Sequence, residues 1–158
     1  MKKEQYNYWH VPLKCHPKNE INVFYDLIKK YKKYGSLYIG VDFDNTLLPY
    51  GEKVILKDSD HNQIINLLKW CKEIGFKLCL WSLSTSQENL DWKIQWCKEH
   101  GIEMDYINES PLMKEFNNVT NKPHFNLLLD DVAGLESSYS ILANLCNYIE
   151  NINKYVEI

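Results

Sequence analysis

The sequence contains no arginine: all 18 of its basic residues are lysine, and with 21 acidic residues the formal net charge is −3. A bound phosphate must therefore be held by lysine, backbone N–H groups, hydroxyls or a metal ion, because no guanidinium fork is present. The acidic balance also argues against a broad nucleic-acid surface. The one dense basic cluster, KKYKK at 29–33, is interpreted as the solvated last turn of a helix, with local nucleic-acid contact as the alternative.

Long apolar runs are also missing. A membrane-spanning helix needs ~18 or more consecutive apolar residues, and no segment approaches that length. Residues 1–17 have no apolar run of the kind that marks a signal peptide. We therefore expect a soluble, cytoplasmic protein with no membrane partner. Its 158 residues fit one domain, with a core at about 36–150 and residues 1–18 as a candidate N-terminal arm.

Cysteine is present only in odd number and without paired spacing. The five cysteines lie at positions 15, 71, 79, 97 and 146, and none forms a C-x-x-C pair. This pattern does not favour a disulfide framework or a zinc site. Cys71 and Cys97 lie in helical patterns and Cys79 in an apolar strand, so we interpret them as small buried hydrophobic residues.

Hydrophobic periodicity predicts alternating helices and strands. We expect helices at 19–34, about 58–74, 87–100 and 136–155, and strands at 37–41, 76–82, 104–108 and 125–131. Gly35, Gly75 and Gly101 end the first three helices, and Asp58, Ser59 or Asp60 caps the second. Strands separated by helices pair in parallel with right-handed crossovers, and nearly continuous apolar strands indicate helices on both faces. The expected fold is α/β, with a Rossmann-like parallel β-sheet flanked by helices on both faces.

Polar residues gather where these strands end. Asp42 and Asp44 follow the first strand, Ser82 ends the second, and Asp130 and Asp131 end the last. Ligands of open parallel sheets bind beyond the carboxyl ends of the strands, so these side chains are expected to meet at one edge. Each of them alone reads as an ordinary turn or capping residue, and their joint occurrence is what indicates a site.

Several carboxylates at one place repel one another unless a cation neutralises them. Oxygen ligands select a hard divalent ion, and Mg²⁺ takes one or two carboxylates together with water and phosphate. A lysine, Lys122, comes shortly before the last strand. A metal, an aspartate nucleophile, a hydroxyl and a lysine together are the equipment for phosphoryl transfer.

The motifs resemble those of the haloacid dehalogenase-like (HAD) superfamily. DFDNTLL at 42–48 resembles its first motif, D-x-D-x-T after an apolar strand, and LCLWS at 78–82 resembles the second. Lys122 resembles the third motif and LLLDD at 127–131 the fourth. The chain is most similar to small, capless phosphatase-type members of bacteria and phages. Ser84 stands where many of these have arginine.

The resemblance implies a role for each matching residue. Asp42 would be the nucleophile that becomes an aspartyl-phosphate, and Asp44 would protonate the leaving oxygen and then activate water. Asp42, Asp44 through its backbone carbonyl, and Asp130 would hold Mg²⁺, with Asp131 in or next to the coordination sphere.

The same resemblance implies a phosphate-binding set. Ser82 and Leu83 would hold the phosphate, Lys122 would neutralise its charge, and Thr46 would shape the turn beside it. The places where related enzymes carry a cap have room here only for a short flap and a loop, so the site should be open.

These expectations lead to a Mg²⁺-dependent phosphomonoester hydrolase whose partner is a phosphorylated small molecule or polymer end, with a nucleotide or nucleic-acid end phosphate as the first candidate. The alternatives are a sugar or small-metabolite phosphatase and a non-catalytic binding protein with the same fold. An oligomer is compatible with the sequence, which does not fix the number of subunits.

Overall fold

The computed structural model describes residues 16–51, 56–109 and 123–156. Helices and strands alternate along this part of the chain, in the order that periodicity predicted. The elements are α1 (His16–Tyr34), β1 (Tyr38–Val41), α2 (Asp58–Ile74), β2 (Lys77–Leu80), α3 (Gln87–Glu99), β3 (Tyr106–Ile107), β4 (Leu127–Leu129) and α5 (Leu135–Val156). The strands are shorter than predicted, because their outer residues already belong to the loops that leave the sheet.

The strands form one sheet in the order β3-β2-β1-β4, and every pairing is parallel. The central strand β1 sets the register: Val41 pairs with Leu80 of β2 on one side and with Leu129 of β4 on the other. Hydrogen bonds continue this register for one more residue, from Trp81 N to Val41 O (2.8 Å) and from Asp42 N to Leu129 O (2.9 Å). The loops after β1, β2 and β4 therefore leave the sheet at the same level.

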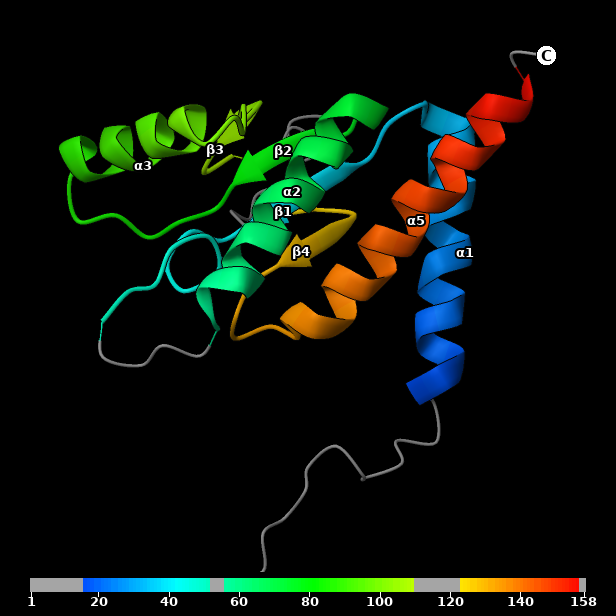
Figure 1. Ribbon diagram of the computed structural model, residues 1–158, viewed down its shortest axis with the longest axis horizontal. Helices are drawn as coiled ribbons and strands as arrows, with labels where there is room; N and C mark the ends of the chain where they lie inside the picture. The colour runs from blue at the N-terminus through cyan, green and yellow to red at the C-terminus, as the bar shows by residue number, and fades with distance from the viewer. Residues whose placement is uncertain (1–15, 52–55, 110–122, 157–158) are drawn as a thin grey trace, which may run out of the picture.

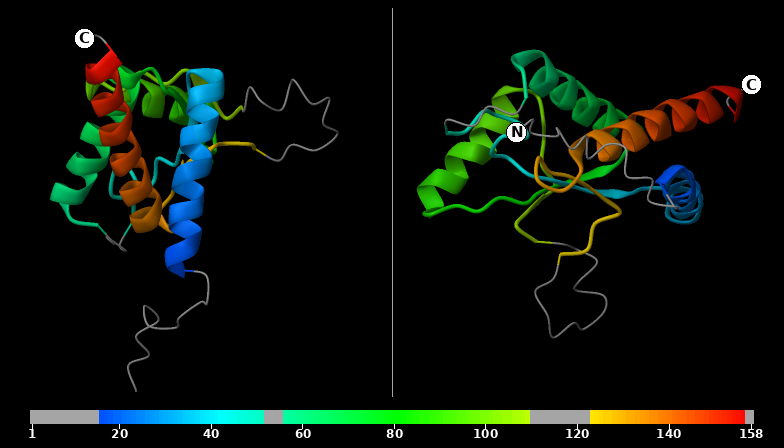
Figure 2. Two further views of the ribbon diagram at one scale, coloured as in Figure 1. Left: turned by 90° about the vertical axis from the view of Figure 1, so that its right-hand side faces the viewer. Right: turned by 90° about the horizontal axis from the view of Figure 1, so that it is seen from below.

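Four described helices flank the sheet and complete a Rossmann-like α/β fold, as the sequence predicted. Figure 1 shows α2 and α5 crossing in front of the sheet, and the two helices pack against each other, with α2 also on β2 and α5 also on β4. Helix α1 lies beside α5 (Figure 2), where the rings of Phe24 and Tyr148 meet edge to face at 6.0 Å. These contacts enclose a core of fully buried aliphatic side chains, among them Leu37, Ile39, Leu78, Leu142 and Leu145.

Two similar segments, WCKEIG at 70–75 and WCKEHG at 96–101, end helices in similar ways. Gly75 follows α2 and Gly101 lies just past α3, both with positive φ (95° and 74°), a conformation that glycine adopts at low cost. Cys71 and Cys97 are completely buried, and together with the buried Cys79 they confirm the interpretation of these residues as hydrophobic core. The start of α2 differs from prediction: Lys57 is the capping position, and Asp60 accepts from its backbone N–H at 3.0 Å.

Neither connection that could carry a cap is long enough for a second domain. Residues 42–57 join β1 to α2, and residues 108–126 join β3 to β4, whereas domains have about 50 residues or more. No cap domain is evident beside the described part of the sheet, as expected. None of the helices within the described ranges is long and apolar enough to cross a membrane. The KKYKK cluster falls in the last turns of α1, where the sequence placed it.

Gly40 in β1 lies directly under the ring of Phe125. A Cβ at this position would come within 2.4 Å of the Phe125 ring, and such overpacking destabilises a core by about 1–3 kcal/mol. We expect Gly40→Ala to lower the free energy of unfolding by that amount, measured by chemical denaturation. The same substitution in a Phe125→Leu background should cost less, and an equal cost in both backgrounds would contradict the proposed clash.

Candidate functional site

The loop after β1 places one aspartate before and one after a buried phenylalanine. Phe43 and Leu47 are 1% exposed and fix the loop to the core, while a tight turn closes through Leu47 N to Phe43 O at 2.9 Å. Asn45 adopts a positive φ of 61°, a conformation that asparagine tolerates better than most residues. Its side chain accepts from Tyr50 N at 2.9 Å. The spacing of two residues thus leaves Asp42 and Asp44 free to face the sheet edge.

Asp130 lies next to Asp42 because of the strand register. Val41 and Leu129 are paired, so the residues that follow them are neighbours across the ~4.8 Å that separates adjacent strands. Asp130 Oδ1 accepts from Val132 N at 2.9 Å, which turns the chain toward α5. The predicted convergence of the first and last strands at one acidic edge is therefore present in the structure.

Thr46 connects the loop after β1 to the loop after β4. Its side chain is completely buried, and its hydroxyl lies 3.4 Å from Asp42 Oδ2 as donor and accepts from Asp131 N at 3.0 Å. The Thr46 carbonyl lies 2.9 Å from Nδ1 of the buried His61; a carbonyl can only accept, so Nδ1 carries the proton. Thr46 therefore orders the two acids, and its buried hydroxyl does not face solvent where a substrate would bind.

Ser82 is held in place by an asparagine that directly follows the neighbouring strand β3. Its backbone N–H donates to Asn108 Oδ1 at 2.8 Å, and Asn108 Nδ2 donates back to Ser82 O at 3.0 Å. The Ser82 side chain is 6% exposed. Sequence reasoning treated Asn108 only as the end of the third strand and missed this clamp. Leu83, which follows Ser82, is 90% exposed, so its polar contribution to the site comes from its backbone.

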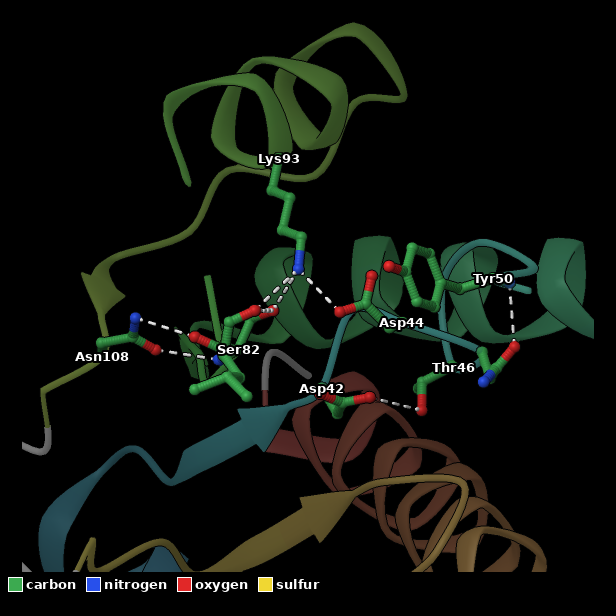
Figure 3. Close-up of polar contacts among 9 residues, drawn as sticks. Asp42, Asp44, Thr46, Tyr50, Ser82, Lys93 and Asn108 are labelled. Atoms are coloured by element: carbon green, nitrogen blue, oxygen red, sulfur yellow. Dashed lines mark hydrogen bonds and ion pairs between the residues drawn. The ribbon is translucent and has the colours of Figure 1, made fainter. Parts of the chain in front are cut away.

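A buried lysine, Lys93 of α3, completes the group (Figure 3). Its Nζ donates to Asp44 Oδ2 at 2.7 Å, to Ser82 Oγ at 2.8 Å and to the Leu83 carbonyl at 3.1 Å, and the residue is only 3% exposed. Sequence reasoning missed Lys93 because helix lysines are usually solvated. The signal was its position on the face that carries Cys97 four residues on, since a lysine on the buried face of an amphipathic helix is rare unless it is paired.

The aspartates at this sheet edge disfavour one another's ionised form. Burial raises the pKa of Asp42 to about 7; the backbone N–H of Phe43 works in the opposite direction, and Asp130, Asp44 and Asp131 raise the pKa further. The pKa of Asp131 is also raised, first by burial and then by Asp130. A cation placed between these carboxylates would relieve both effects.

The donor set fits a hard cation. In the described part of the chain, no three side chains of His, Cys, Asp or Glu stand together as a ready metal site. Mg²⁺ needs only one or two protein carboxylates besides water and substrate oxygens, and Asp42 and Asp130 offer two on adjacent strands, with the Asp44 carbonyl nearby in sequence. The carboxylates raised in pKa at this edge are the observation that favours such an ion. Lys122, the lysine predicted to bind phosphate, lies outside the described residues.

Neither a model of a known protein family nor any curated protein matches the chain. Among solved structures, a conserved protein from Bacteroides thetaiotaomicron is similar at 25% sequence identity, with a TM-score of 0.52. The match covers 72% of this chain and 91% of that protein. That protein is described only as conserved, so the likeness supports the α/β fold and gives no activity.

The raised pKa of Asp42 predicts how stability depends on pH without metal. Folded Asp42 keeps its proton between 3.8 and about 7, where the unfolded chain has released it, so the free energy of unfolding loses this contribution as the pH rises through that window. In chelator-containing buffer, Asp42→Asn should flatten this part of the profile and be more stable than the wild type at pH 7. Chemical denaturation at stepped pH measures both.

Asp26→Asn on α1 is the control, because Asp26 is exposed and pairs with Lys30 at the surface. Asp105, whose pKa is lowered, adds to the free energy of unfolding as the pH rises. This contribution is common to wild type and variants, so it cancels when their profiles are subtracted. Identical profiles for wild type and Asp42→Asn would contradict the raised pKa.

Proposed function

We propose that the protein is a Mg²⁺-dependent phosphomonoester hydrolase of the haloacid dehalogenase-like type that acts through an aspartyl-phosphate. The observation that carries the proposal is the meeting of Asp42, Asp44, Ser82 and Asp130 at one sheet edge, in the order along the chain of the first, second and fourth motifs. Raised carboxylate pKa values in a site are typical of functional positions, and a cation beside Asp42 would relieve the raised pKa there.

The reaction has two halves. In the first, a carboxylate oxygen of Asp42 attacks phosphorus, the bond from phosphorus to the ester oxygen breaks, and Asp44 gives its proton to the leaving alcohol. In the second, Asp44 takes a proton from a water whose oxygen attacks the phosphorus, which releases inorganic phosphate and restores Asp42. The hydroxyl of Ser82 donates to a phosphate oxygen in both halves, and the Asn108 clamp keeps the Ser82 backbone still.

Asp42, Asp130 and the backbone carbonyl of Asp44 would hold Mg²⁺, with Asp131 beside them. The ion would neutralise the charge that builds up between an ionised nucleophile and a phosphate dianion. Thr46 contributes by holding Asp42 and the Asp131 backbone at a fixed separation. Lys122 is proposed as a further neutralising charge on the basis of its motif.

The rim of the site favours a substrate with a flat apolar part. Large hydrophobic side chains are exposed on the loops and helix around it: Tyr50 at 68%, Leu83 at 90%, Trp92 at 50% and Val132 at 84%. Trp92 is held on edge against Phe43 at 5.7 Å. Aromatic side chains of this kind stack on bases, so we propose a nucleotide or a nucleic-acid end phosphate as substrate. Sugar phosphates and other small phosphorylated metabolites are the alternative.

The two aspartates of the first motif should respond differently to removal of their charge. Asp42→Asn should abolish turnover of an aryl phosphate, because no aspartyl-phosphate can form. Asp44→Asn should slow turnover of an alkyl phosphate far more than that of a p-nitrophenyl ester, whose leaving group needs little protonation. Steady-state rates on both esters measure this, and equal losses on the two would rule out an acid role for Asp44.

Magnesium should stabilise the folded protein through Asp130. A ligand bound only by the native state raises the thermal midpoint, so Mg²⁺ should raise it in the wild type and not in Asp130→Ala. Asp26→Ala, which removes the same charge from an exposed position of α1, should respond to Mg²⁺ like the wild type. An unchanged magnesium response in Asp130→Ala would remove Asp130 from the metal site, and no turnover of any phosphate ester with Mg²⁺ would favour the non-catalytic binding protein.

A further inference from the structure

The ammonium of Lys93 is fully satisfied by three acceptors of different kinds. Ser82 provides a hydroxyl at 2.8 Å, Leu83 a backbone carbonyl at 3.1 Å and Asp44 a carboxylate at 2.7 Å. The Nζ atom of Lys93 lies over the ring of Phe43, 5.3 Å from the ring centre. A lysine has three N–H donors, so no donor remains for a substrate unless one of these contacts is exchanged.

The contact with Asp44 is the one open to exchange. The side chain of Asp44 is 30% exposed, whereas that of Lys93 is 4% exposed and Ser82 is also buried. Water can therefore solvate Asp44 after the ion pair separates, while the hydroxyl of the buried Ser82 has no comparable access to water. The long unbranched stem of a lysine lets its ammonium change partner by small rotations, without movement of the helix.

The location of the ammonium matches that of an anion bound by Ser82. Ser82 Oγ lies 2.8 Å from Lys93 Nζ. A phosphate oxygen that accepts a hydrogen bond from Ser82 Oγ would therefore also lie close to the Lys93 ammonium. A cation and a hydroxyl that both donate to the same oxyanion bind it strongly, because one of the two hydrogen bonds is charge-assisted. Because the chain contains no arginine, lysine is the only side chain that can bring a permanent positive charge to this oxygen.

We propose that Lys93 is a phosphate-binding residue that exchanges its contact with Asp44 for a phosphate oxygen when the ligand binds. The proposal rests on the proposed function, since it assigns a further ligand to the same phosphate. It has a mechanistic consequence: the arrival of phosphate frees the Asp44 carboxyl from the ammonium at the moment when Asp44 is needed beside the leaving oxygen. Without phosphate, Lys93 keeps Asp44 fixed and the loops after β1 and β2 together.

Inorganic phosphate is the probe, because its binding needs no turnover. Isothermal titration in Mg²⁺-containing buffer should show that Lys93→Met binds phosphate about tenfold or more weakly than the wild type, as expected for the loss of one charged hydrogen bond. Methionine keeps an unbranched side chain at this position and removes the charge. Lys98→Met, an exposed lysine of the same helix, is the matched control and should bind phosphate like the wild type.

A second variant tests the exchange and retains Lys93. In Asp44→Asn the ammonium has lost its charged partner, so phosphate should bind more tightly than in the wild type. Adding Lys93→Met to this background should abolish the gain. The phosphate affinity of Asp44→Asn alone tests the exchange even if Lys93→Met does not fold. The thermal midpoint of each variant shows whether it folds.

The outcomes separate this proposal from the proposed function. Equal phosphate affinity in wild type and Lys93→Met, or no gain in Asp44→Asn, would overturn the role of Lys93 and leave phosphatase activity untouched. Phosphate binding that depends on Lys93 in a protein that hydrolyses no ester would support the Lys93 contact and refute the enzyme. A wild type that binds no phosphate at millimolar concentration would overturn the Lys93 proposal.

Discussion

The gathering of acidic charge at the end of β1 is the constraint that the rest of the site serves. The parallel register puts Asp42 beside Asp130, and burial with neighbouring acids raises the pKa of Asp42 to about 7. Such a group opposes folding at neutral pH unless something offsets it. The backbone N–H of Phe43 opposes the rise of the Asp42 pKa. In addition, the Thr46 hydroxyl donates to Asp42 at 3.4 Å, and the Lys93 ammonium pairs with Asp44 at 2.7 Å.

The cost of this arrangement bears on the choice between an enzyme and a binding protein. A charged residue can lower the stability of a fold at a position where a neutral residue would raise it. Such a residue is expected at a functional site and is hard to explain elsewhere. Replacing Asp42 by a neutral residue would remove the repulsion without disturbing the buried Phe43 or Leu47 that anchor the loop. A protein that used this edge only as a docking surface would not require a carboxylate at this depth.

Sequence reasoning reached the parts that local chemistry determines. The apolar strand before Asp42, the D-x-D-x-T spacing and the glycine after α2 each have one structural solution that fits, and the structure contains them. Lys93 and Asn108 were missed for a common reason: their roles depend on contacts between α3 or β3 and loops distant in sequence. A lysine in a helix is solvated in most proteins, and only the packing of α3 over the β1 and β2 loops buries this one.

The absence of arginine and the burial of Lys93 fit together physically. A guanidinium binds two oxygens in a fixed plane, so moving it between a carboxylate and a phosphate requires both contacts to break together. An ammonium is nearly a point charge and can change one contact while the other two persist. In this site the persistent contacts are the hydroxyl of Ser82 and the carbonyl of Leu83, which belong to the loop that ends β2. Lysine is therefore the cation that lets the charge beside Asp44 move while the framework around it stays fixed.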